Sequence, residues 1–166
     1  EAAYSGQTPV YNDATTEDGQ PSIANYIKKI FLVSDNDAYN RLYEFLGQEY
    51  INTQLSKMGY EAQIRHRLDI VLSEDENRHT NPVKFLTPEG RSLYQQPMQF
   101  NQQVYAARKD FLGKGYYSGG TVVKTPLDFS IKNRIRLEDL HEILKSVLFP
   151  EAVPAKQRFN LKEEDY

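Results

Sequence analysis

A serine, an acid and an amide stand in a row at Ser34-Asp35-Asn36, between two apolar patterns of helical spacing. A serine hydroxyl can accept and donate a hydrogen bond, an amide side chain can hold a polar group, and a carboxylate can brace a turn by accepting backbone N–H groups. These are residue types that can relay a proton and orient a substrate. They are also good helix N-caps, so the tripeptide alone predicts only the start of a helix.

Three helices in series are predicted around this tripeptide. Their apolar residues recur three or four positions apart, which is typical of a helix packed on a core. Ser22 predicts the start of the first helix, and Gly47 and Gly59 predict the ends of the second and third. The apolar stripes are Ile23, Tyr26, Ile27, Ile30 and Phe31; then Ala38, Leu42, Phe45 and Leu46; then Ile51, Leu55 and Met58.

The rest of the chain predicts a mixture of loops, strands and one more helix. Residues 65–81 are charged and aperiodic, which indicates a long exposed loop. Residues 82–99 favour a hairpin, and residues 101–111 favour a short helix. We expect a short strand at 121–123 and a strong helix at 137–148, which Pro150 closes. The predicted fold class is mainly α with a small antiparallel β hairpin.

Composition excludes several classes of function. The chain has 166 residues, enough for one domain with a core, and its net charge of −3 leaves no basic excess for binding nucleic acid. Because it has no cysteine, disulfides, thiolate catalysis and cysteine-based zinc sites are excluded. No apolar run approaches the roughly 20 residues that span a bilayer. We expect no cofactor.

The acidic stretch near residue 75 has two interpretations, a metal site or a solvated charged loop. Glu74, Asp75, Glu76 and His79 are close in sequence and offer oxygen and imidazole ligands. A solvated charged loop explains the same residues more simply. We therefore predict no metal.

The stretch from Ile27 to Tyr60 resembles the S-D-N segment of class A β-lactamases and related penicillin-binding serine hydrolases. In that family the motif follows one amphipathic helix and opens another, and glycines and an Arg-Leu pair come after it. Gly47, Gly59 and Arg67-Leu68-Asp69 match this order. The resemblance extends more loosely to Asn81, and it implies the helical subdomain of a β-lactamase/transpeptidase-like fold.

The resemblance also implies roles for the tripeptide. Ser34 would be a catalytic residue that carries a proton to the leaving nitrogen. Asn36 would be both catalytic and substrate-binding, since it would hold the amide carbonyl of the substrate and brace a catalytic lysine. Asp35 would have a structural role at the site, pinning the turn through hydrogen bonds to the backbone.

The chain departs from the family at three places. No serine has a lysine three residues later, so the S-x-x-K motif of the nucleophile is absent. Lys124-Thr125-Pro126 has proline where the K-T-G strand needs glycine. Leu72 occupies the position of the glutamate that frees the acyl-enzyme in class A enzymes, which puts β-lactam hydrolysis in question.

Two hypotheses of function follow. In the first, residues 1–166 are one helical subdomain, a fragment of a larger α/β serine hydrolase that cleaves a peptide, amide or ester through an acyl-enzyme; this chain alone would be inactive. Its partners would be the missing α/β domain or a second copy bound through an exposed apolar face. The alternative is a non-catalytic binding or interaction module on the same scaffold. By family analogy, either would work in the periplasm or cell envelope.

Overall fold

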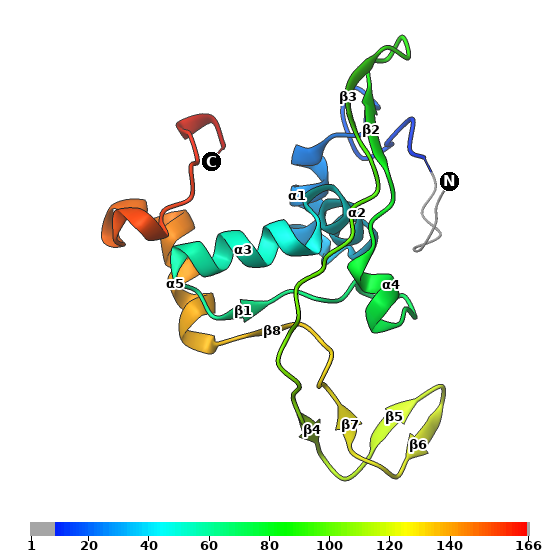
Figure 1. Ribbon diagram of the computed structural model, residues 1–166. Helices are drawn as coiled ribbons and strands as arrows, with labels where there is room; N and C mark the ends of the chain where they lie inside the picture. Colours follow the sequence, from blue (N-terminus) through cyan, green and yellow to red (C-terminus); the bar gives the residue numbers. More distant parts are fainter. Residues whose placement is uncertain (1–8, 166) are drawn as a thin grey trace. The chain divides into compact units, whose positions relative to one another are not determined.

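The computed structural model describes residues 9–165 (Figure 1). These residues divide into two compact units. The first unit contains residues 9–49 and 65–104, and the second contains residues 50–64 and 105–165. The prediction of a single subdomain within a larger protein stays a prediction. We describe each unit by itself.

The first unit begins with two helices joined by the predicted tripeptide. Helix α1 spans Ile23–Val33, and the Ser22 side chain caps it by accepting the Asn25 N–H, as predicted. Helix α2 spans Asn36–Leu46 and ends at Gly47, which has the predicted positive φ of 78°. Helix α3, Gln48–Met58, follows at once and ends before Gly59. Local capping therefore determines where these helices begin and end.

Strands β2, Val83–Leu86, and β3, Ser92–Gln96, form the predicted antiparallel hairpin. Its turn closes with a hydrogen bond from Gly90 N–H to the Thr87 carbonyl. The hairpin packs against α2 through three aromatic rings, because the ring centroids of Phe45, Phe85 and Tyr94 are 5.2 to 5.8 Å apart. This cluster contributes apolar packing to the first unit.

Residues 65–81 are not the exposed loop that the sequence predicts. They include a short helix, α4, at Glu74–Arg78, and several of their polar side chains are buried. Arg67 is 0% exposed and Asn77 is 1% exposed. The prediction was wrong because charge and lack of periodicity indicate exposure only where the polar groups find no partners in the protein.

The second unit is built around helix α5, Leu137–Leu148, which the sequence predicts. Strand β1, Ala62–Gln63, pairs with β8, Arg134–Ile135. The Ser146 hydroxyl and the Tyr60 hydroxyl both donate to the Gln157 carbonyl, at 2.6 and 3.2 Å. These bonds fix the C-terminal segment, with its short 3-10 helices η1 (Pro150–Ala152), η2 (Ala155–Gln157) and η3 (Glu163–Asp165), to the unit.

Residues 101–110 have no regular secondary structure, so the predicted helix at 101–111 is wrong. The sequence 106–108 has helical propensity, but the carbonyls of Asn101 and Gln103 accept hydrogen bonds from the Arg78 guanidinium at 3.0 and 2.8 Å. A side chain distant in sequence thus takes the acceptors that a helix would use for its own backbone.

Two further strand pairs follow in the second unit. Strand β4, Phe111–Leu112, pairs with β7, Leu127–Asp128, and β5, Tyr116–Ser118, pairs with β6, Thr121–Val123, where a strand was predicted. The described residues thus contain five α-helices and four antiparallel strand pairs. The predicted mixture of helices with a hairpin is confirmed in outline, with more β structure than expected. No helix among residues 9–165 is both long enough and apolar enough to cross a bilayer.

Candidate active site

Ser34 ends α1 in a left-handed backbone conformation. Its φ and ψ are 54° and 44°, and its N–H donates to the Ile30 carbonyl at 3.1 Å. An L-residue in this region carries a steric cost of roughly 1–2 kcal/mol, which glycine would avoid. The serine side chain is exposed. A strained turn therefore presents a hydroxyl group to solvent between two helices.

Asp35 is the N-cap of α2. Its Oδ1 accepts the Ala38 N–H at 2.9 Å, and its carbonyl accepts the Tyr39 N–H at 3.1 Å. An aspartate cap of this kind stabilises a helix by about 1 kcal/mol. Asp35 thus fixes the direction in which α2 leaves the turn, and with it the residues on either side.

Asn36 is the first residue of α2 and is exposed. Positions four apart lie on the same face of a helix, so Asn36 shares a face with Asn40 and Glu44. Asn40 is 7% exposed and Glu44 is 3% exposed. Asn36 is therefore the solvent-facing end of a polar helix face whose inner part is buried.

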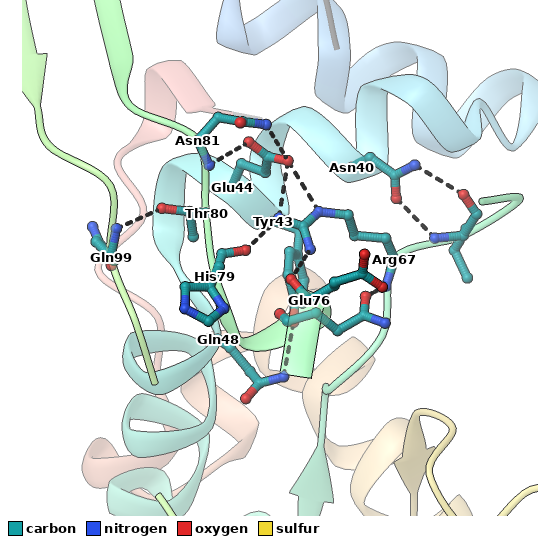
Figure 2. A network of polar contacts seen from close by, with 12 residues as sticks. Asn40, Tyr43, Glu44, Gln48, Arg67, Glu76, His79, Thr80, Asn81 and Gln99 are labelled. Carbon is teal, nitrogen blue, oxygen red and sulfur yellow. Dashed lines mark hydrogen bonds and ion pairs between the residues drawn. The ribbon is translucent and has the colours of Figure 1, made fainter. Parts of the chain in front are cut away.

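Asn40 joins this face to the segment after α3. Its side-chain amide donates to the Leu68 carbonyl at 2.8 Å, and its side-chain oxygen accepts the Leu68 N–H at 2.8 Å. The amide thereby bonds both backbone groups of one residue, as a neighbouring strand would. This pair of hydrogen bonds from Asn40 (Figure 2) holds the backbone at Leu68 beside α2, about one helical turn after Asn36.

Glu44 and Arg67 form a buried ion pair at the centre of Figure 2. Arg67 Nη2 lies 2.9 Å from Glu44 Oε1, and the two side chains are 0% and 4% exposed. Glu44 also accepts the backbone and side-chain N–H groups of Asn81, at 2.9 and 3.1 Å. Arg67 donates to the carbonyls of Glu76 and His79, at 3.3 and 2.6 Å. These bonds join residues 67–81 to α2 and to one another.

Tyr43 extends the network on the same helix. Its hydroxyl donates to the Asn77 carbonyl at 2.9 Å and accepts from Gln48 Nε2 at 3.0 Å. The Arg67 guanidinium lies 5.2 Å from the centroid of the Tyr43 ring. The Asn77 side chain in turn accepts the Arg67 N–H at 2.9 Å. The segment is therefore anchored to α2 at both of its ends.

The two glutamates of the anchored segment are engaged in structural bonds. Glu74 pairs with Arg65. Glu76 accepts the Ser73 N–H and hydroxyl, both at 2.7 Å, which completes a capping box at the start of α4. Those bonds, the backbone one first, lower the pKa of Glu76 below its ordinary value. Leu72, at the position where class A enzymes have their glutamate, is half-buried.

The histidine of the same segment also has a structural environment. The His79 ring stacks on Phe100 with centroids 4.4 Å apart, and its Nδ1 lies 2.9 Å from the Asp75 carbonyl. Among the residues that the structure describes, no three His, Asp or Glu side chains gather in a way that could hold a metal ion.

Sequence reasoning found the tripeptide but missed the buried polar network. We expected the inward face of α2 to be apolar, yet Leu46 is 40% exposed while Asn40, Tyr43 and Glu44 are buried. The available signal was the spacing of polar residues at positions 36, 40 and 44, which is as helical as that of the apolar ones. Whether Ser34, Asp35 and Asn36 have the predicted roles in catalysis remains a prediction.

Comparison with known proteins gives one match. A family model described as "Beta-lactamase enzyme family" matches residues 2–105. No curated protein and no solved structure matches the chain. The matched range includes the tripeptide and the anchored segment, and it ends before the paired strands β4 to β7.

Proposed function

From the premise that this chain belongs to the beta-lactamase enzyme family, we propose that it is part of a serine hydrolase that cleaves an amide or ester through an acyl-enzyme. The observation that supports this proposal most is the α1–α2 turn. The Asp35 side chain accepts the hydrogen bond that caps α2, whereas Ser34 and Asn36 on either side of it are exposed. The turn that the Asp35 cap stabilises thus carries an exposed hydroxyl group, from Ser34, and an exposed amide group, from Asn36.

In this proposal Ser34 carries the proton from the nucleophile to the leaving group. Its hydroxyl can accept a proton and donate its own in the same step. Asn36 binds an amide carbonyl of the substrate through its side-chain NH₂ group and braces the catalytic lysine. The strained backbone at Ser34 is consistent with a residue retained for its hydroxyl, since such strain concentrates at functional sites.

The nucleophile lies outside these 166 residues in our proposal, because none of the nine serines is followed by lysine at the third position. The α/β part of the same protein would supply it, together with the strand that binds the substrate backbone. We further propose a peptide-like substrate in the periplasm or cell envelope. Rapid hydrolysis of β-lactams is not part of the proposal, since Leu72 replaces the glutamate and both Glu74 and Glu76 are engaged elsewhere.

Acylation of the full-length gene product tests the proposal. We would incubate it with a fluorescent penicillin and, separately, with a fluorophosphonate, and follow the intact mass. General acid–base groups typically contribute a factor of about 10²–10⁴, so Ser34→Ala should slow labelling by roughly that factor. Ser56→Ala, an exposed serine on α3, is the matched control and should label like the unaltered protein.

The outcomes separate the hypotheses. Labelling that Ser34→Ala slows and Ser56→Ala leaves unchanged would support both the acyl-enzyme and the role of Ser34. Labelling that is equal in all three proteins would remove Ser34 from the mechanism. If neither reagent labelled the protein, the hydrolase proposal would be wrong, and the tripeptide would serve only as a helix cap.

A further inference from the structure

Strands β4 to β7 form one continuous hairpin, which we call the β-arm, residues 110–129. Phe111 pairs with Asp128 and Tyr117 pairs with Val122, so both strand pairs share a single register along the chain. The tip is the pair Gly119-Gly120, with φ values of 55° and 81°. Two successive positive φ values are typical of the tight two-residue turn that connects the strands of a β-hairpin.

Arg108 fixes the base of the β-arm. Its guanidinium donates to the carbonyls of Phe129, Ser130 and Lys132, at 3.1, 3.0 and 2.8 Å. It also lies 3.3 Å from an Asp110 carboxylate oxygen. An isolated two-stranded ribbon is marginally stable in water. These bonds at the base therefore hold a ribbon whose outer part has little packing of its own.

Five large apolar side chains of the β-arm are exposed. Phe129 is 38% exposed, and Phe111, Leu112, Tyr117 and Val122 are 59%, 67%, 74% and 64% exposed. Tyr117 and Val122 are directly paired across the two strands, so they lie side by side on one face of the ribbon. Tyr117 and Val122 thus form an exposed apolar cluster next to the tip, which indicates a contact surface, whereas Phe111 and Leu112 lie near the base of the β-arm.

The charge around this cluster is positive. Lys114 and Lys124 are exposed, and no acidic residue occurs between Phe111 and Leu127. Residues 108–134 carry six basic and two acidic side chains, whereas the whole chain has a net charge of −3. The basic side chains are thus concentrated around the β-arm, and the other residues sum to a net negative charge. An anionic surface would attract this region and repel the others.

We propose that the β-arm docks on the surface of a lipid bilayer that contains anionic lipids. A specific protein interface usually needs some 20–30 residues on each side, far more than the exposed cluster offers. A bilayer surface needs only a few inserted apolar side chains with lysines beside them. Tyrosine suits this position because its ring is apolar and its hydroxyl is polar. The β-arm lies beyond the family match, so this proposal does not rest on the proposed catalysis.

The absence of tryptophan from the chain makes a direct test possible. We would place the only tryptophan at the tip with Tyr117→Trp and, as the matched control, far from the β-arm in sequence with Tyr11→Trp, since Tyr11 is 72% exposed. Vesicles of phosphatidylcholine with about one third phosphatidylglycerol should shift the emission of the Tyr117→Trp variant to shorter wavelength. They should leave the emission of the Tyr11→Trp variant unchanged, and vesicles of phosphatidylcholine alone should shift neither.

Flotation with the same vesicles measures the contribution of charge. Each lysine close to an anionic bilayer strengthens binding roughly fivefold, so Lys114→Gln/Lys124→Gln should weaken binding about 25-fold. The control Lys28→Gln/Lys84→Gln removes the same charge from two exposed lysines elsewhere and should bind like the unaltered protein. Circular dichroism would verify that both double variants are folded.

Three results would overturn the proposal. The protein could fail to float with the anionic vesicles, or both double variants could bind equally. Finally, a concentration-dependent shift of the Tyr117→Trp emission without vesicles would assign the surface to a second copy of the chain.

Discussion

Glu44 and Arg67 are held in place by more bonds than their own ion pair. The carboxylate accepts from Asn81 and the guanidinium donates to the carbonyls of Glu76 and His79, so each charge has partners in the protein beyond the ion pair. A buried pair of this kind adds little net stability relative to apolar residues, yet removing one partner leaves an uncompensated charge. The effect of a single substitution should therefore be large.

We predict that Glu44→Ala destabilises the chain by about 3–5 kcal/mol. The loss arises because Arg67 would stay buried without its counter-charge and Asn81 would lose its acceptors. Urea unfolding followed by circular dichroism measures it. The matched control is Asp37→Ala on the same helix, whose carboxylate is 62% exposed and pairs with Arg41. It should cost less than about 1 kcal/mol; equal losses in both variants would show that Glu44 and Arg67 are not buried together.

At the scale of elements, the α1–α2 junction combines a helix end, a strained residue and a helix start within three positions. Gly47, Gly59 and Gly90 take positive φ elsewhere in the chain, but this turn uses Ser34. Glycine would relax the backbone here, although it would lose some conformational entropy on folding. Serine at position 34 should therefore lower the free energy of unfolding relative to glycine, and this difference can be measured.

Ser34→Gly is predicted to raise the free energy of unfolding by about 0.5–1 kcal/mol, because it removes the left-handed strain. The same variant should lose acylation in the labelling assay described above. Thermal unfolding gives the first quantity, and Asp69→Gly is the control for it, since Asp69 has the same φ of 54°. If Ser34→Gly lowered stability while Asp69→Gly raised it, the hydroxyl would have a structural role instead.

At the scale of the whole molecule, large apolar side chains remain exposed at the end of α1. Phe31, Leu32 and Val33 are 81%, 80% and 71% exposed, and none of the residues of α1 is buried. Soluble proteins seldom leave such a contiguous patch uncovered. We propose that the α/β part of the same protein covers this patch; in the isolated chain, a second copy would take its place.

The 166-residue chain is therefore predicted to dimerise through α1, in a manner that depends on concentration. Sedimentation velocity over a hundredfold range of concentration measures this equilibrium. Phe31→Ser/Leu32→Ser should shift it toward the monomer. Leu93→Ser, which removes a 67% exposed leucine from β3, should leave it unchanged. A monomer throughout that range would count against an uncovered docking face on α1.

Local interactions explain why part of this structure could be predicted. Caps and apolar spacing depend on residues within one turn, so the sequence predicted α1, α2, α3 and α5, with Ser22, Gly47 and Gly59 at their ends. The β2–β3 hairpin was predicted for the same reason, because its turn residues are contiguous. The order of motifs around Ser34 also led to the family, which the match to residues 2–105 bears out.

Contacts between distant residues decided what the sequence could not. Charged residues usually indicate solvent, but Arg67 is buried because Glu44, 23 positions away, faces it. Residues 101–103 are not helical, because the carbonyls of Asn101 and Gln103 accept hydrogen bonds from Arg78. Such hydrogen bonds offset the free-energy cost of burying a polar group only when the fold has brought both partners together. The sequence by itself therefore determined α1, α2, α3, α5, the β2–β3 hairpin and the family, whereas α4, the buried polar anchor beside Asn36 and the single register of the β-arm were decided by the tertiary structure.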